Sequence, residues 1–321
     1  MSAPTSVYQG SNSVLLNQTL VTEFLLLGVT DIQELNPILF VTVLAMYFVN
    51  VAGNGAILLI VISDPRLHSP MFFLGNLACL DICFSTVTVP KMLENFFSTS
   101  KAISFLGCIT QLYFFHLLGS TEALLLAVMA FDRFVAICRP LHYPSIMNRQ
   151  VCIQVAISIW AIPFVHALVH SILTSQLNFC GSNRIHHFFC DVKPLLELAC
   201  GNTELNRWLL NTFTGTFAIG LFFLTFLSYF YIITYLFLKT RSCSMLHKAL
   251  STRASHFMVV MIFYAPVLFI YINPDSGSSL EKDRIIAVMY TVVTPALNPL
   301  IYTLKNKEVR CALNRKLRIL L

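Results

Sequence analysis

Seven runs of apolar residues, each long enough to cross a lipid bilayer, are the feature that most constrains this chain. They lie near residues 38–62, 71–93, 106–138, 151–173, 207–238, 249–272 and 284–304. A helix needs about 20 such residues to span a hydrocarbon core of roughly 30 Å. Because lipid offers the backbone no hydrogen-bond partners, runs of this length are expected to be helices. The sequence therefore predicts an all-α membrane protein, a bundle of seven transmembrane helices.

The composition agrees with this prediction and excludes a soluble globule. Of 321 residues, 56% are hydrophobic and only 11% are charged, which is too little charge to cover a soluble protein of this size. We expect an extracellular segment at 1–37, a transmembrane domain at 38–304 and a cytosolic tail at 305–321.

Basic residues predict the orientation of the bundle. Most of the 21 Lys and Arg residues fall on alternate loops that share one side and in the C-terminal segment, and none precedes Pro37. The positive-inside rule then places the N-terminus outside and the C-terminus in the cytosol. Anionic membrane lipid attracts the basic loops, so the net charge of +6 requires no nucleic-acid partner.

Sequence features on the predicted outer side fit an oxidising compartment. Asn17 begins an N-glycosylation tripeptide, Asn-Gln-Thr, although such tripeptides also occur by chance. Four of the ten cysteines, Cys108, Cys180, Cys190 and Cys200, fall on this side. An even set of four is typical of disulfides, and the residues alone leave three pairings open.

Two acidic residues lie in the middle of predicted spans. Asp81 is in the second apolar run and Glu122 in the third, and Asn54 and Asn298 are their expected neighbours. Carboxylates at this depth are costly and face the bundle interior. We interpret them as a buried polar network and a candidate Na⁺ site; the alternative is a polar contact that only fixes helix packing. No nucleophile or metal-ligand set accompanies them, so an enzyme is not expected.

Five motifs resemble the signature of vertebrate olfactory receptors, which are rhodopsin-like G-protein-coupled receptors. They are LHSPMFFLGNLACLD, MAFDRFVAICRPLHYPSIMN, SYFYIITYLF, KALSTRASHFMVV and PALNPLIYTLKNKEV. The loop NFCGSNRIHHFFCDVKPLLELAC is also typical of the family, and the resemblance runs from Glu23 to Leu313. It implies a multi-pass receptor of the plasma membrane that binds small, mostly apolar volatile odorants within the bundle, needs no cofactor and activates a stimulatory G protein, which raises cyclic AMP.

The resemblance also assigns roles at the cytosolic end. Asp132, Arg133 and Phe134 stand where the family has Asp-Arg-Tyr, so the acid is expected to hold the guanidinium at rest and to release it on activation. A short amphipathic helix is expected from Lys305 to Leu313. The coupling and switch residues implied are Asp132, Arg133, Tyr229, Lys248, His256, Asn298, Pro299 and Tyr302.

The family pattern pairs Cys108 with Cys190 and Cys180 with Cys200. His186, His187 and Asp191 beside Cys190 have the donor types of a metal site. A cysteine in a disulfide is not a thiolate ligand, however, so these residues do not establish one.

The predicted ligand pocket lies in the outer half of the bundle. On the third helix one face carries Leu112, Phe115, His116, Gly119, Ser120 and Ala123 at helical spacing. Position in the family adds Phe213, Phe217, Tyr264, Val267, Leu268, Tyr271 and Thr291. His116, Ser120 and Tyr271 are the candidate hydrogen-bond donors of a site that is otherwise apolar.

Two departures from the family pattern leave alternatives open. The stretch between Pro70 and Asn76 is one residue shorter than in the family, and Arg253 replaces a usual Cys. The shortened stretch makes a defective receptor one alternative. A receptor of the same fold for a non-odour ligand in another tissue is a separate alternative. A transporter or channel would be expected to show inverted repeats with broken helices, and we find no such repeat in the sequence.

Overall fold

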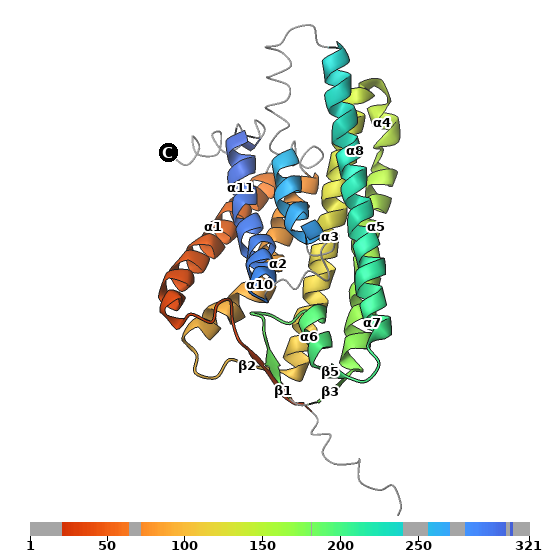
Figure 1. Ribbon diagram of the computed structural model, residues 1–321. Coiled ribbons are helices and arrows are strands. Elements are labelled where there is room, and N and C mark those ends of the chain that lie inside the picture. Colours follow the sequence, from red (N-terminus) through yellow and green to blue (C-terminus); the bar gives the residue numbers. More distant parts are fainter. Residues whose placement is uncertain are drawn as a thin grey trace, which may run out of the picture.

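The computed structural model describes residues 21–63, 72–180, 182–239, 256–269, 280–305 and 309–310. Its long helices lie side by side in one bundle, and the short strands gather at one end (Figure 1). We call this the disulfide end, because Cys108 and Cys190 are joined there. The opposite end carries Asp132 and Arg133 and is called the inner end.

The first four long helices match the first four predicted apolar runs closely. They are α1 (Asn36–Ser63), α2 (Phe72–Phe97), α3 (Phe105–Cys138) and α5 (Arg149–Ser175). Side-chain caps fix two of their beginnings: Ser104 accepts from the Gly107 N–H, and Asn148 accepts from the Val151 N–H. Such caps satisfy backbone donors that have no partner inside the helix.

Two later spans contain a π-helical turn, which sequence reasoning did not predict. The fifth span consists of α7 (Glu204–Trp208), η4 (Leu209–Thr214) and α8 (Gly215–Lys239). The last consists of α10 (Leu280–Val288), η5 (Met289–Val293) and α11 (Thr294–Lys305). A hydroxyl at the end of each π turn reaches back five residues: Thr214, the last residue of η4, donates to the Leu209 carbonyl at 3.4 Å, and Thr294, directly after η5, donates to the Met289 carbonyl at 3.0 Å. Such turns are frequent at functional sites.

Six helical stretches among the described residues are long and apolar enough to cross a membrane. The helix His256–Phe269 is shorter and lies within the predicted run 249–272. Large apolar side chains point outward from the bundle, with Phe48 71% and Leu59 67% exposed. Such faces suit lipid as the surrounding solvent, so the prediction of a helical membrane protein is confirmed.

Helix α3 is the centre of the bundle. It packs against α2, α5 and α8, whereas α1 packs against α2 and α11. The approach of α1 to α11 requires a glycine, since a Cβ added to Gly53 would lie 2.7 Å from Cβ of Pro299. The same addition at Gly55 meets nothing within 4 Å.

The all-α prediction missed two small sheets at the disulfide end. In the first, β1 (Glu23–Leu26) pairs antiparallel with β2 (Ala102–Ser104) and parallel with β4 (Arg184–Ile185). In the second, β3 (Asn178–Phe179) pairs with β5 (Ala199–Cys200). Strands this short carry no readable alternation, and their partners come from distant loops. Four short helical turns complete the loops: η1 (Gln33–Leu35), η3 (Pro140–His142), α4 (Tyr143–Ile146) and α6 (Val192–Leu198).

A buried arginine attaches the N-terminal segment to the last span. Arg284, only 2% exposed, donates from both terminal nitrogens to the two carboxylate oxygens of Asp31 at 3.1 Å. This hydrogen bond lowers the pKa of Asp31 below its usual value. Residues 21–35, the described part of the segment before α1, are therefore attached to the helix bundle.

Several sequence predictions lie outside the described residues. These are the glycosylation site Asn17, the coupling residue Lys248, the pocket residue Tyr271, the shortened stretch near Met71, the replacement at Arg253 and most of the helix expected at 305–313. They stay predictions, as does the division into 1–37, 38–304 and 305–321.

Candidate functional site

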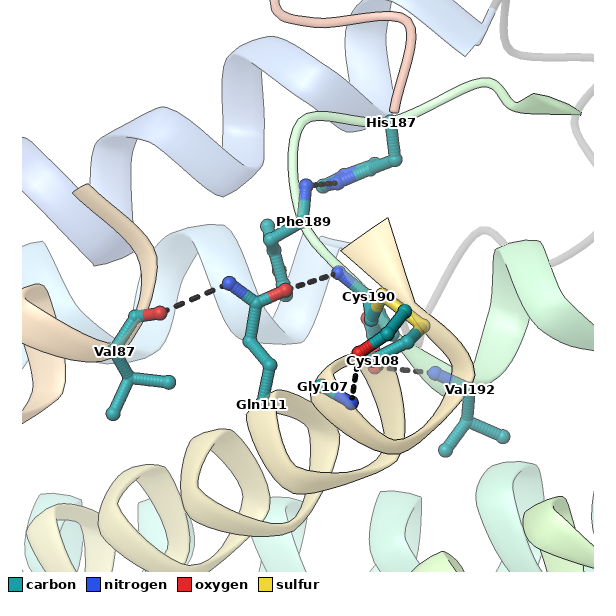
Figure 2. The surroundings of a disulfide bond; sticks show 10 residues. Val87, Gly107, Cys108, Gln111, His187, Phe189, Cys190 and Val192 are labelled. Carbon is teal, nitrogen blue, oxygen red and sulfur yellow. Dashed lines mark hydrogen bonds between the residues drawn. A yellow bond between two sulfur atoms is a disulfide. The ribbon is translucent and has the colours of Figure 1, made fainter. Parts of the chain in front are cut away.

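A disulfide and a glutamine hold the predicted outer loop against α3 (Figure 2). The Sγ atoms of Cys108 and Cys190 are 2.04 Å apart, and Cys180 is joined to Cys200. These are the pairs that the family pattern implies. Gln111, one turn along α3 from Cys108, accepts from the Cys190 N–H at 2.9 Å and donates to the Val87 carbonyl at 2.9 Å. One amide thus links the loop, α3 and α2.

Below this disulfide the bundle encloses a cavity of about 350 Å³. Aromatic and aliphatic side chains form much of its wall, including Phe84, Phe115, Phe217, Phe263 and Tyr290. Size and lining are those of a small-molecule site. Of the predicted pocket residues, the cavity is lined by Phe115, His116, Gly119, Ser120, Ala123, Phe217, Tyr264 and Val267.

The other described candidates do not line the cavity. Leu112 is fully buried in a separate apolar cluster with Cys108 and Cys190, because it lies close under the disulfide. Phe213 is 50% exposed on the outer face of the bundle. Thr291 is fully buried and donates to the Ala287 carbonyl within its own helix, and Leu268 packs at the edge of the core.

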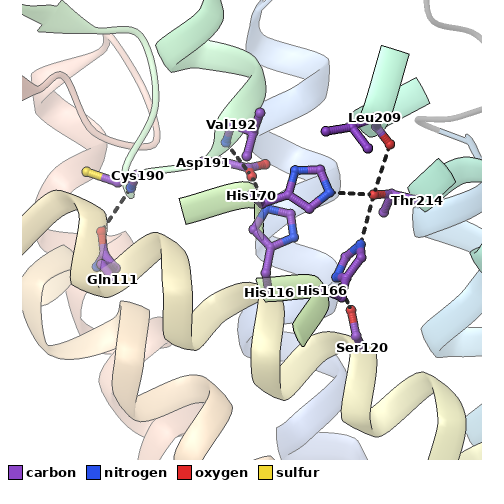
Figure 3. A network of polar contacts seen from close by, with 10 residues as sticks. All are labelled: Gln111, His116, Ser120, His166, His170, Cys190, Asp191, Val192, Leu209 and Thr214. Carbon is purple, nitrogen blue, oxygen red and sulfur yellow. Dashed lines mark hydrogen bonds and ion pairs between the residues drawn. The ribbon is translucent and has the colours of Figure 1, made fainter. Parts of the chain in front are cut away.

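One wall of the cavity is polar: His116, Ser120 and Thr214 line it, and two further histidines lie behind them (Figure 3). His166 and His170 come from α5, and His116 comes from α3. The Thr214 hydroxyl lies 3.0 Å from Nε2 of His166 and 2.9 Å from Nε2 of His170. On its other side, His166 Nδ1 lies 3.3 Å from the Ser120 hydroxyl.

Charged groups of the loop and of α10 complete the cavity at the disulfide end. Lys193 contacts Asp283 at 2.7 Å, so their charges compensate. Burial opposes ionisation of Asp191, but the neighbouring His116 and the Val192 N–H outweigh it and lower the pKa of Asp191. Burial lowers the pKa of His187 to about 4, and this ring is therefore neutral at physiological pH.

A second polar cluster lies deeper in the bundle. Asn298 donates to both carboxylate oxygens of Asp81, at 2.9 and 3.0 Å. Asn54 donates to the side-chain oxygen Oδ1 of Asn50 at 2.6 Å, and the Asn50 side chain donates to the Asp81 backbone carbonyl at 3.0 Å. The structure thus brings together three of the four predicted network residues and adds Asn50, which precedes Asn54 by one helical turn.

Glu122, the fourth predicted network residue, is incompletely paired. It is 1% exposed and interacts electrostatically with Asp81. Neither of its carboxylate oxygens has a hydrogen-bond partner among the described residues, and neither does Oδ1 of Asn298. Such buried oxygens suit a proton or a small cation. A sodium ion at Asp81 and Glu122 therefore stays a prediction.

The inner end shows how the predicted switch residues lie. Asp132 accepts from the Tyr143 hydroxyl at 2.8 Å, and it makes no ion pair with Arg133 in the part of the chain that the structure describes. The hydroxyl of Tyr229 is hydrogen-bonded to Nδ1 of His256. Tyr302 is buried, and its hydroxyl has no partner among the described residues. The contact between Asp132 and Arg133 that the resemblance implies is thus not formed in this structure.

Sequence reasoning missed several residues of the cavity and of its support. His166 and His170, which contact the lining residues Ser120 and Thr214, were absent from the prediction, although two histidines four residues apart in an apolar run occupy one helix face. Thr214, Tyr290 and the pair Lys193 and Asp283 carried no comparable signal.

The fold and cavity define a multi-pass helical membrane receptor with a small-molecule site inside its bundle. Comparison with known proteins is specific: a family model described as olfactory receptor matches residues 43–319. The human olfactory receptor 12D1 is 75% identical over 95% of each chain, and human 12D2 is 74% identical over 95% of this chain and 99% of its own. The mouse olfactory receptor 4E2 is 47% identical over 93% of this chain and 96% of its own.

The chain belongs to the olfactory receptor family. It is a G-protein-coupled odorant receptor of a non-enzymatic family, whose members are seven-helix bundles. The predictions of family, fold class and general function are therefore confirmed.

Proposed function

We propose that this receptor binds small, mostly apolar volatile molecules in the cavity between α3, α8, the helix His256–Phe269 and the loop that follows β4, and that it activates a stimulatory G protein and raises cyclic AMP. The cavity is the observation that carries the proposal. It lies near the predicted outer end, has an apolar part lined by residues such as Phe84, Phe217 and Phe263, and carries polar and charged groups on α3, on the loop and at the disulfide end. A ligand there is held by dispersion and by one or two hydrogen bonds.

The inner end supports coupling to the G protein. Arg133 follows Asp132 at the end of α3, and Asp132 is engaged by Tyr143 rather than by its neighbour. Since charged groups at the membrane edge can exchange partners at modest cost, Arg133 is placed to contact a cytosolic protein after the helices move. Asp132, Tyr229, His256, Asn298, Pro299 and Tyr302 belong to the same proposed switch. We assign the receptor to the plasma membrane, because it belongs to the olfactory receptor family and has several long apolar helices.

Cyclic AMP in cells that express the full chain tests this proposal. Wild type and Arg133→Ala are compared at matched surface display against a panel of neutral and weakly polar volatiles. We expect a ligand-dependent rise in wild type that Arg133→Ala abolishes. Arg139→Ala, which changes a neighbouring basic residue beyond the end of α3, is the control for loss of cytosolic charge. A rise that survives Arg133→Ala unchanged would contradict the assigned coupling residue.

A further inference from the structure

The polar wall of the cavity is held rigid by ring contacts between its histidines. The rings of His116 and His170 are stacked, with centroids 5.1 Å apart and planes 9° apart. The ring of His166 meets that of His170 edge-on, with centroids 4.7 Å apart. All three side chains are at least nine-tenths buried. Packed rings with little room to rotate present their nitrogen atoms in fixed directions.

Three ring nitrogens of the two α5 histidines have hydroxyl partners. Both ring nitrogens of His166 have hydroxyl partners, Thr214 and Ser120. Nε2 of His170 shares the Thr214 hydroxyl. Thr214 is the last residue of the π turn η4, so the irregular turn places the hydroxyl between the two rings. These residues support the wall and are not the contacts of a ligand.

His116 differs from His166 and His170 in the pairing of its Nε2 atom. This nitrogen is buried and has no hydrogen-bond partner among the described residues. It lies 3.4 Å from Oδ1 of Asp191, which is an ion-pair distance without hydrogen-bond geometry (Figure 3). His116 and Asp191 both line the cavity. A donor and an acceptor therefore lie next to each other in the cavity wall, and the contact between them lacks the geometry of a full hydrogen bond.

The charges around the cavity favour a neutral ligand. Lys193 is neutralised by Asp283, and Glu197 and Arg207, which also line the cavity, carry opposite charges. A cationic ammonium group at Asp191 could donate to the carboxylate, but it has no lone pair with which to accept from Nε2 of His116. An anionic ligand at His116 would face the carboxylate of Asp191. Charges placed next to like charges in a partly buried site are unfavourable.

From this geometry we infer that the preferred ligands are alcohols or phenols, whose hydroxyl group accepts a hydrogen bond from Nε2 of His116 and donates one to the carboxylate of Asp191. This inference rests on the proposed function, since it names the ligand class of the same cavity. A hydroxyl both donates and accepts, so it satisfies both groups at once. An aldehyde, ester or ether only accepts, and leaves the carboxylate of Asp191 without a donor on that side. A site built for a hydroxyl rejects such analogues because its buried polar groups then stay unpaired.

In this arrangement Asp191 and His116 contact the ligand, whereas His170 and Thr214 are positioning residues. The carboxylate next to His116 favours the tautomer with the proton on Nε2, the nitrogen that faces it. Asp191 is itself fixed, because it accepts from the Val192 N–H at 2.7 Å at the start of α6.

The experiment uses matched sets of volatiles, in which each linear, branched or cyclic skeleton is tested as alcohol, aldehyde and methyl ether. The full-length receptor is purified in detergent, and its thermal unfolding is followed with each compound, in parallel with cyclic AMP in cells. Ligands that bind the folded state raise the unfolding temperature whether or not the G protein couples. We expect at least one alcohol to bind about tenfold more tightly than its aldehyde and its ether, as the loss of one good hydrogen bond implies.

Variants separate this contact from general packing. His116→Phe keeps a ring stacked on His170 but has no donor, so it should bring the alcohol and the ether of a skeleton to similar affinity. His116→Gln restores an N–H and should restore part of the preference. Val267→Ala, on the apolar wall, should weaken both compounds alike.

Either of two results would overturn the inference: aldehydes or ethers that stabilise the receptor as well as or better than the matched alcohols, or a panel of alcohols that stabilises it not at all. Preferential stabilisation by alcohols without any cyclic AMP response would instead leave the ligand class standing and contradict the proposed coupling.

Discussion

The two polar clusters inside the bundle differ in how completely their atoms are paired. In the histidine wall, Ser120 and Thr214 engage three ring nitrogens, and among the described residues Nε2 of His116 is left without a hydrogen bond. In the deeper cluster, both oxygens of Glu122 and one atom of Asn298 have no partner in the part of the chain described. In the first cluster one ring nitrogen remains for a contact with a ligand. In the second cluster several oxygen atoms remain unpaired, and a proton, a cation or a helix movement can provide their partners.

The largest effect is expected where a buried carboxyl group depends on a single neighbour. Asn298→Leu removes both hydrogen bonds to Asp81 and should destabilise the receptor by about 3–5 kcal/mol, as removal of one partner of a buried polar pair does. The matched control is Asn95→Leu, because Asn95 is also buried but neither of its polar atoms has a partner among the described residues. Its replacement should be neutral or stabilising. Thermal unfolding of the two purified variants measures their stabilities. If both variants lose the same amount of stability, paired and unpaired amides do not differ in their contribution.

A pH-dependent effect is expected at the disulfide end. The pKa of His187 is about 4 in the folded receptor and 6.5 in an exposed chain. The unfolded state therefore binds the extra proton first, and stability falls as the pH drops from about 6.5 to about 4, by about 3 kcal/mol in total. His187→Phe removes the titrating ring and should flatten this part of the profile. Unfolding temperatures measured across that range would test the sign, and parallel profiles for the two proteins would exclude His187 as the cause.

The smallest effect is expected for a partly exposed ion pair. Lys193 and Asp283 join α6 to α10 at 2.7 Å, with side chains 38% and 23% exposed, so the pair is worth about 0.5 kcal/mol. Lys193→Asp or Asp283→Lys alone should raise the ligand concentration for half-maximal cyclic AMP slightly, and the double swap should restore it. If the double variant needs a higher ligand concentration for half-maximal cyclic AMP than either single variant, the contact acts through something other than charge.

The helical framework could be predicted from the sequence because the surrounding lipid constrains it so strongly. The run 106–138 and the helix Phe105–Cys138 differ by one residue at their beginning. The sheets could not be predicted, because β1 and β4 pair residues such as Leu25 and Arg184 that lie far apart in the chain. The π turns at Leu209–Thr214 and Met289–Val293 also lack a sequence signal.

The candidate site was predicted where helical spacing fixed it and missed where tertiary contacts did. Phe115, His116, Gly119 and Ser120 share one face of α3 and line the cavity. Leu112 shares that face but lies too close to the disulfide, and Phe213 points out of the bundle. His166 and His170 were overlooked because a histidine in an apolar run is more often a buried packing residue than a ligand contact.

The attachment of the N-terminal segment can form only late in the synthesis of this receptor. Strand β1 leaves the ribosome early, yet Asp31 must wait for Arg284, which is 253 residues away in the chain. Until that arginine emerges, the segment before α1 lacks its two hydrogen bonds to the last span. A chain that terminates before the last span therefore never makes this attachment.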